Sequence, residues 1–179
     1  YHSIGKPQKA LEYYEKALPI WQEVGDRSLE ATTLSNIGEV YEKIGKPQKA
    51  LEYLEKALPI SQEVGDRSGE ATTLNNIGAV YRSIGKPQKA LEYYEKALPI
   101  RQEVGDRSGV AVTLSNIGGV YSDIGKPQKA LEYYKKALPI SQEVGDRSGV
   151  AVTLNNIGGV YSQIGQPQKA LEYLEKALP

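Results

Sequence analysis

Cysteine is absent from the 179 residues of this sequence, and so is methionine. Without cysteine the chain can form no disulfide, no thiolate metal site and no cysteine nucleophile. No apolar run approaches the roughly 18 residues that a membrane-spanning helix needs. The sequence also carries no signal-peptide pattern. We therefore expect a cytoplasmic protein that does not contact a membrane.

An excess of charge of one sign is also lacking, because 22 lysine and arginine residues balance 22 aspartate and glutamate residues. A neutral chain has no overall field that would attract nucleic acid. The only histidine, His2, stands at the terminus, where chains tend to fray, so it is a poor candidate for a general base. Glu52 stands four residues before Lys56, a spacing typical of a solvated helix surface. We predict no enzyme, no cofactor, no metal site and no nucleic-acid partner.

What the sequence contains is an internal repeat of forty residues, which has to be interpreted before any single motif. The segment ATTLNNIGAVYRSI, at 71–84, returns three more times with few changes. Units of this length need neighbours to bury their apolar faces, so we expect one array over residues 1–179. Both ends match the middle of a repeat, which together with the missing methionine predicts a fragment of a longer array. The expected helix pairs are at about 28–64, 67–104, 107–144 and 147–179, with a partial repeat at 1–25.

Each repeat predicts two helices. Asp66 or Ser68 can cap the start of the first helix, and Gly85 supplies a stop after it. Pro87 suits the first turn of the second helix, because its missing N–H would have no partner there. Pro99 stands inside the second helix, where it removes a backbone hydrogen bond. We expect a kink or a break at Pro99 and at its counterparts Pro19, Pro59 and Pro139.

A helical wheel divides the first helix into faces. Leu74, Ile77 and Tyr81 gather on a core face, and Gly78 lies beside them, where a missing side chain lets another helix approach closely. The residues that differ between repeats share an arc of roughly 140° opposite most of the core. On that arc also lies an asparagine that never varies, whose side chain can hold the backbone of an extended peptide by donating and accepting hydrogen bonds. Each asparagine can equally bond a neighbouring helix and fix the stack.

Two aromatic features need separate interpretation. Tyrosines recur at Tyr13, Tyr53, Tyr93, Tyr133 and Tyr173. Without a net basic groove to hold nucleic acid, we interpret them as packing residues rather than as a platform for bases. Trp21 replaces the serine or arginine of the other repeats, and it is either an anchor at an interface or a cover for the first unit.

The pattern L-x-N-I-G-x-V-Y followed by A-L-E-Y-[YL]-x-K-A resembles the tetratricopeptide repeat. Repeats of this length, with their GDRSGEA linkers, are similar to those of Pins-type polarity adaptors, kinesin light chains and bacterial multi-repeat signalling proteins. The resemblance implies an all-α fold, an α-solenoid whose antiparallel helix pairs form a right-handed superhelix. It also implies a concave groove that is lined by first helices and binds peptides. The residues that carry it are Leu74, Ile77, Gly78, Tyr81, Ala90, Tyr94 and Ala97, with their counterparts in the other repeats.

The variable arc and the resemblance together predict a non-enzymatic scaffold that binds a protein or peptide in the concave groove. Two alternatives stay open: a structural spacer with end-to-end self-association, and the sensor segment of a larger bacterial signalling protein. The lysine and arginine set of a carboxylate clamp is not reproduced, so chaperone C-termini are not expected as ligands. The predicted groove residues are Asn36, Asn76, Asn116 and Asn156, with Ser35, Asn75, Ser115, Asn155, Glu39, Arg82, Asp123 and Lys43.

Overall fold

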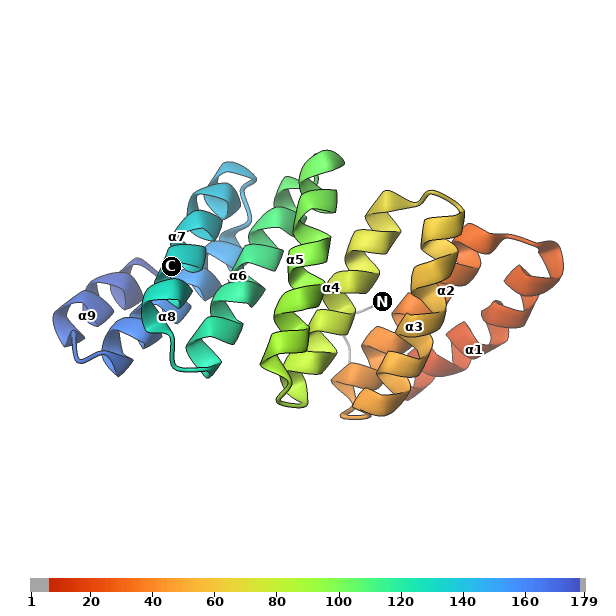
Figure 1. The fold of residues 1–179 in the computed structure, drawn as a ribbon, viewed down its shortest axis with the longest axis horizontal. Coiled ribbons are helices and arrows are strands. Elements are labelled where there is room, and N and C mark those ends of the chain that lie inside the picture. The colour runs from red at the N-terminus through yellow and green to blue at the C-terminus, as the bar shows by residue number, and fades with distance from the viewer. Residues whose placement is uncertain (1–6, 178–179) are drawn as a thin grey trace. The chain divides into compact units, whose positions relative to one another are not determined.

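The computed structural model describes residues 7–177, which form nine helices and no strand (Figure 1). The helices are α1 (Pro7–Val24), α2 (Arg27–Lys43), α3 (Pro47–Glu63), α4 (Arg67–Ser83), α5 (Pro87–Glu103), α6 (Arg107–Asp123), α7 (Pro127–Glu143), α8 (Arg147–Gln163) and α9 (Pro167–Lys176). The chain divides into two compact units, Tyr1–Ala97 and Leu98–Pro179, here called unit 1 and unit 2. The start of the predicted partial repeat at 1–25, which includes His2, lies outside the described residues.

The first helices begin alike because an aspartate caps each of them. The backbone N–H of Gly69 donates to the Asp66 carboxylate at 2.8 Å, so Asp66, not Ser68, is the cap of α4. Gly65, just before the cap, has a φ of 71°, a left-handed conformation that side chains rarely adopt. The predicted start and end signals of the first helix are confirmed, since α4 begins directly after Asp66 and ends at Ser83, two residues before Gly85. The same cap recurs at Asp26, Asp106 and Asp146.

The second helices continue through their internal prolines. α3 contains Pro59 and α7 contains Pro139, and both helices are unbroken over 17 residues. A break at these prolines is therefore wrong, whereas a kink there stays a prediction. A proline removes one backbone hydrogen bond, but burial on either side of it holds the last turn in place. Ala57 is fully buried and Ile60 is 8% exposed, and both pack against α2.

Glycine on the first helix and a large residue on the second helix form the tight contact of each repeat. A Cβ at Gly38 would lie 2.6 Å from Cγ of Leu54 and 3.1 Å from the carbonyl oxygen of Ala50. A Cβ at Gly78 would lie 2.8 Å from the ring of Tyr94. Real Cβ atoms do not approach other atoms so closely, so the predicted close approach at this glycine is confirmed.

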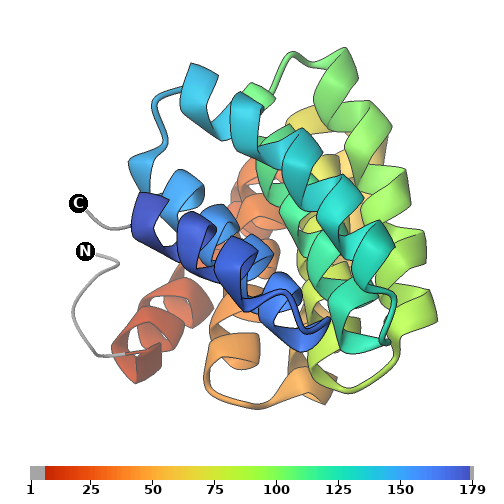
Figure 2. The same cartoon turned by 90° about the vertical axis from the view of Figure 1, so that its left-hand side faces the viewer.

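Within a unit, successive first helices contact each other, whereas successive second helices do not. α2 packs against α4 in unit 1, and α6 packs against α8 in unit 2. No comparable contact joins α1 to α3 or α7 to α9 in the described part of the chain. Each unit is therefore narrower on the side of its first helices and curves toward them. The first and second helix of a repeat also pack together, and Figure 2 shows α8 and α9 of unit 2 lying side by side.

Candidate functional site

The side of each first helix that faces away from its own second helix carries a row of residues at i, i+4, i+7 and i+11. Because each unit curves toward its first helices, this row lies on the inner side of the unit. We call it the first-helix stripe. Its members are Thr32, Asn36, Glu39 and Lys43 on α2; Thr72, Asn76, Ala79 and Ser83 on α4; Val112, Asn116, Gly119 and Asp123 on α6; and Val152, Asn156, Gly159 and Gln163 on α8.

The stripe asparagines are half-buried. The side chains of Asn36, Asn76 and Asn156 make no hydrogen bond to any residue of the described chain. The alternative that each asparagine bonds a neighbouring helix has no such bond to support it at these three positions. A carboxamide that is partly withdrawn from water but unpaired keeps its donors and its acceptor for a ligand.

The residue before each asparagine has a different environment, at the contact between successive first helices. Ser35 and Asn75 are each 8% exposed. The hydroxyl of Thr73 on α4 donates to that of Ser35 on α2 at 3.3 Å, and the hydroxyls of Ser115 and Thr153 pair at the same distance in unit 2. A wheel of one helix cannot reveal this burial, because the helix of the next repeat covers that edge of the arc. Little surface of Ser35 and Asn75 is left for a ligand. Their counterpart Asn155 on α8 is exposed.

The predicted charged residues are distributed unevenly between the units. On α2, Lys43 donates to Glu39 at 2.5 Å, a pair of partly exposed side chains on the stripe itself. Such a pair stabilises a helix by about 0.3–0.5 kcal/mol and leaves both charges largely solvated. Arg82 is half-buried one position outside the stripe of α4, and Asp123 is exposed at the end of the stripe of α6. The stripe of α8 carries no charge.

Recurring tyrosines of the second helices stack on tyrosines of the first helices, a pairing that the repeat pattern alone does not predict. The rings of Tyr41 on α2 and Tyr53 on α3 lie 5.5 Å apart at an interplanar angle of 20°. Lys49 lies 5.3 Å from the centre of the Tyr41 ring, and Lys56 lies 5.5 Å from that of Tyr53. Burial raises the pKa of the Tyr41 phenol, and the charge of Glu15 raises it further. Equivalent stacks join Tyr81 to Tyr93, Tyr121 to Tyr133 and Tyr161 to Tyr173.

These stacks confirm the interpretation as packing residues for Tyr53, Tyr93, Tyr133 and Tyr173. For Tyr13, which is 69% exposed, it stays a prediction. Ring faces that already contact a tyrosine and a lysine ammonium are not available to nucleic-acid bases. The two tyrosines of each stack are visible in the sequence. Pairing them, however, requires knowing how the second helix lies against the first.

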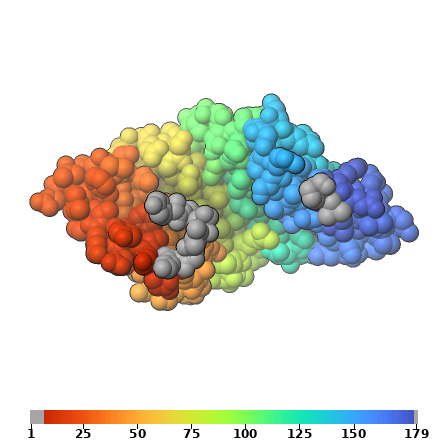
Figure 3. All heavy atoms as spheres, turned by 180° about the vertical axis from the view of Figure 1, so that it is seen from behind, coloured from red at the N-terminus to blue at the C-terminus, as the bar shows by residue number. Residues whose placement is uncertain are grey.

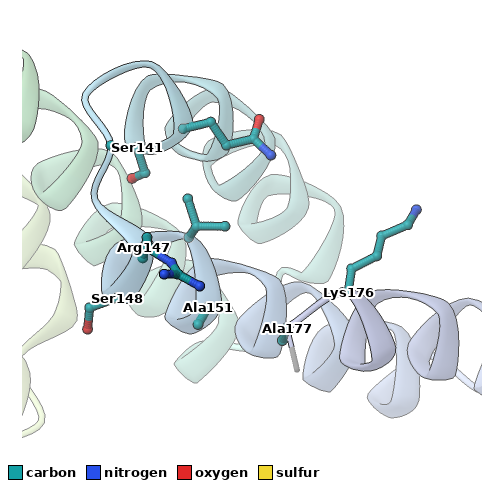
Figure 4. Close-up of a pocket in the computed structure, with 9 residues that line it drawn as sticks. Ser141, Arg147, Ser148, Ala151, Lys176 and Ala177 are labelled. Carbon is teal, nitrogen blue, oxygen red and sulfur yellow. The ribbon is translucent and has the colours of Figure 1, made fainter. Parts of the chain in front are cut away.

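A hollow of about 580 Å³ lies in unit 2, between the last turns of α7 and α9 and the first turn of α8 (Figure 4). Its lining includes Ala151 and Lys176, but the Lys176 ammonium pairs with Glu172 at 2.7 Å. In unit 1 the equivalent surface around Ala31 is covered by Ile60 of α3. α3 has 17 residues and α9 has 10. The hollow therefore reflects the shorter α9, and we do not assign it to a ligand.

Helix α1 lies at the surface of unit 1, in red in Figure 3. Trp21 on this helix is half-buried, whereas its counterparts Ser61 and Ser141 are 2% and 3% exposed. Neither of the two predicted roles of Trp21 is tested by this position, and both stay predictions. Ile20 and Tyr13 on the same helix are 52% and 69% exposed.

Residues 7–177 contain neither a candidate membrane-spanning helix nor a candidate metal site. No helix there is long and apolar enough to cross a membrane. No group of three or more histidine, cysteine, aspartate or glutamate side chains there is placed to hold a metal ion.

Solved structures similar to this chain share its helical architecture. BtubC (BKLC) from P. vanneervenii is 30% identical with a TM-score of 0.85, and the match covers 97% of this chain and 72% of that one. A Podosopora anserina putative kinesin light chain with nearly identical TPR-like repeats is 19% identical with a TM-score of 0.74, over 97% of this chain and 86% of that one. A Rap protein complexed with Competence and Sporulation Factor is 21% identical with a TM-score of 0.85, over 93% of this chain and 47% of that one.

A comparison with curated proteins found no match. The family model described as Tetratricopeptide repeat matches residues 1–63, 29–103, 69–143 and 109–179, which together span the chain. Antiparallel helix pairs, the glycine at the tight contact of each pair and the contacts between successive first helices agree with this match. The chain therefore belongs to the tetratricopeptide repeat family, as an all-α solenoid.

Proposed function

We propose that this protein is a non-enzymatic interaction scaffold whose first-helix stripes bind a peptide segment. The observation that carries the proposal is the pair of unbonded carboxamides of Asn36 and Asn76, at equivalent positions on two first helices that pack together. An extended peptide repeats the same backbone donor and acceptor along its length. A carboxamide can accept from the peptide N–H and donate to the peptide C=O, so this contact needs no particular peptide sequence.

Structures of similar fold add support for a peptide as the ligand. The Rap protein named above was solved with Competence and Sporulation Factor, and the Rap conjugation gene regulator of plasmid pLS20 was solved with the Phr* peptide. The latter is 21% identical to this chain, which spans about half of each Rap structure. The inner side of each unit, where the asparagines lie, is the surface that we assign to the peptide here.

The test is the double substitution N36A/N76A, with Q48A/Q88A as its matched control. The control removes two exposed carboxamides from the second helices and leaves the stripe intact. Random twelve-residue peptides displayed on phage are selected on the immobilised native chain, and the affinity of the retained peptides is measured by fluorescence anisotropy. Since one hydrogen bond contributes about 1 kcal/mol, the double asparagine variant should bind roughly 10- to 30-fold more weakly.

The control should bind like the native chain, and circular dichroism should show that both variants fold. If no peptide is retained, or if folded N36A/N76A binds the selected peptides as tightly as the native chain does, the proposal is wrong.

A second candidate function, self-association, is favoured by the uncovered face of α1. Ile20 is 52% exposed, whereas its counterpart Ile60 is 8% exposed because it packs on α2. Contact between copies that covers Ile20 should produce a concentration-dependent rise in sedimentation coefficient, and I20E should abolish that rise. A sedimentation coefficient that stays at the monomer value at every concentration would exclude this candidate.

A further inference from the structure

The stripes of the two units differ in one systematic way at their first position. In unit 1 this position is held by Thr32 and Thr72, and in unit 2 by Val112 and Val152. Val112 is 44% exposed and Val152 is 53% exposed. Both residues lie on the arc where the repeats differ, but they are not among the predicted groove residues.

The two valines occupy equivalent places on neighbouring helices. α6 packs against α8, and the hydroxyl pair between Ser115 and Thr153 joins the two helices at this level. Each valine lies one helical turn before the stripe asparagine of its own helix, on the same face. A ligand backbone that bonds Asn156 and crosses from α8 to α6 therefore passes beside both valines.

The stripe is uncharged on both helices near the valines. Beyond the asparagine, the stripe position two turns after each valine is glycine on both helices. Gly119 on α6 is buried, whereas a Cβ built at Gly159 on α8 would meet no atom within 4 Å. Asp123 is the one charged residue on the stripes of unit 2, and it lies three turns beyond Val112 on α6. In unit 1, by contrast, the stripe of α2 holds the ion pair of Glu39 and Lys43. A charged ligand side chain next to the valines would therefore lose water without gaining a counter-charge.

We propose that the peptide segment bound by unit 2 presents an aliphatic side chain to Val112 and Val152. This inference rests on the proposed function and specifies the chemistry of its ligand. Isolated exposed apolar residues are common and need no explanation. These two are in register on the stripe, each one turn before a stripe asparagine. Threonine has nearly the shape of valine but carries a hydroxyl group in place of one methyl group. The same stripe position in unit 1 is therefore similar in shape but more polar. The hydroxyl of Thr32, for example, donates to the carbonyl oxygen of Ser28 at 3.0 Å.

The experiment exchanges the two residue types between the units. V112T/V152T gives unit 2 the residues of unit 1, and T32V/T72V makes the reverse change as the matched control. The probe is the set of phage-selected twelve-residue peptides, and their residue frequencies are compared with those of the unselected library. The native chain should enrich valine, isoleucine or leucine at one peptide position. V112T/V152T should bind those peptides about three- to tenfold more weakly, because each exchange removes one methyl contact, whereas T32V/T72V should not weaken them.

A substitution in the peptide tests the same contact with the native protein chain, so the result does not depend on whether a protein variant folds. Replacing the enriched aliphatic residue of the peptide by threonine should weaken binding to the native chain by a similar factor. The same replacement should have little further effect on binding to V112T/V152T, because the contact is already lost.

The outcomes separate this inference from the function on which it rests. Peptides that depend on the asparagines but show no aliphatic enrichment, or no response to V112T/V152T, overturn the valine contact alone. Failure to retain any asparagine-dependent peptide overturns the peptide-binding function, and this inference with it.

Discussion

Two adjacent glycines on α8 offer a stringent test of the packing between first and second helices. A Cβ at Gly158 would lie 2.8 Å from Cγ of Leu174 and 3.2 Å from the carbonyl oxygen of Ala170, both on α9. A Cβ at Gly159 would meet no atom within 4 Å. The two positions share one helix and differ by one residue, so a comparison of Gly158→Ala with Gly159→Ala isolates the effect of packing.

The expected magnitudes follow from two opposing effects. Alanine in place of glycine inside a helix raises the free energy of unfolding by about 0.8–1 kcal/mol, and this gain applies to both variants. At Gly158 the added methyl group forces α9 or the Leu174 side chain to move, which costs about 1–3 kcal/mol. Gly159→Ala should therefore be more stable than the native chain. Gly158→Ala should unfold more easily than Gly159→Ala by about 1–3 kcal/mol, a difference of several degrees in melting temperature.

Thermal and urea unfolding followed by circular dichroism provides the measurement. Hydrogen exchange at the amides of α9 adds a local readout, because the loss of packing at Gly158 should first release this helix. Equal unfolding free energies for the two variants, within about 0.5 kcal/mol, would show that the close approach of α8 and α9 does not limit the residue at 158. The packing argument for every repeat would then be wrong.

Two further predictions concern a helix cap and a surface ion pair. Asp66→Ala should lower the free energy of unfolding by about 1 kcal/mol, because the N–H of Gly69 loses its acceptor, whereas Ser68→Ala should change little; urea unfolding of the two variants decides. The ammonium of Lys56 lowers the pKa of Glu52 by a hydrogen bond and by its charge, so this pair stabilises the fold fully above the unfolded-state pKa of about 4.3. That stabilisation is lost as the pH falls through the lower folded-state pKa, and the difference in unfolding midpoint between the native chain and Glu52→Gln should shrink there and in high salt; a difference that does not change with pH would contradict the assignment.

The parts of the fold that depend on local contacts could be predicted from the sequence. Asp66 caps a helix through a bond to Gly69, only three residues away, and Gly65 permits the turn before it through its own backbone freedom. The helical wheel alone predicts that Gly78 is a point of close approach. These features need no knowledge of how one repeat lies against the next.

The predictions that failed or fell short depend on contacts between helices. The break expected at Pro59 did not appear, because burial of Ala57 and Ile60 against α2 outweighs one lost hydrogen bond. Ser35 is on the same arc as Asn36, but only the position of α4 determines that Ser35 is buried and Asn36 is half-buried. A helical wheel represents a single helix, so it cannot show which of its residues an adjacent helix covers.

The pattern of helix contacts also has a kinetic consequence. Within each unit, every contact between helices joins sequence neighbours or successive first helices. Within a unit the chain therefore never has to close a long loop before contacts form, and a low contact order of this kind is associated with fast folding. Structure can start in any helix pair and spread to the adjacent one. Amide exchange should accordingly be slower in α2 than in α1 and slower in α8 than in α9, because α2 and α8 pack against more of the described helices of their own unit.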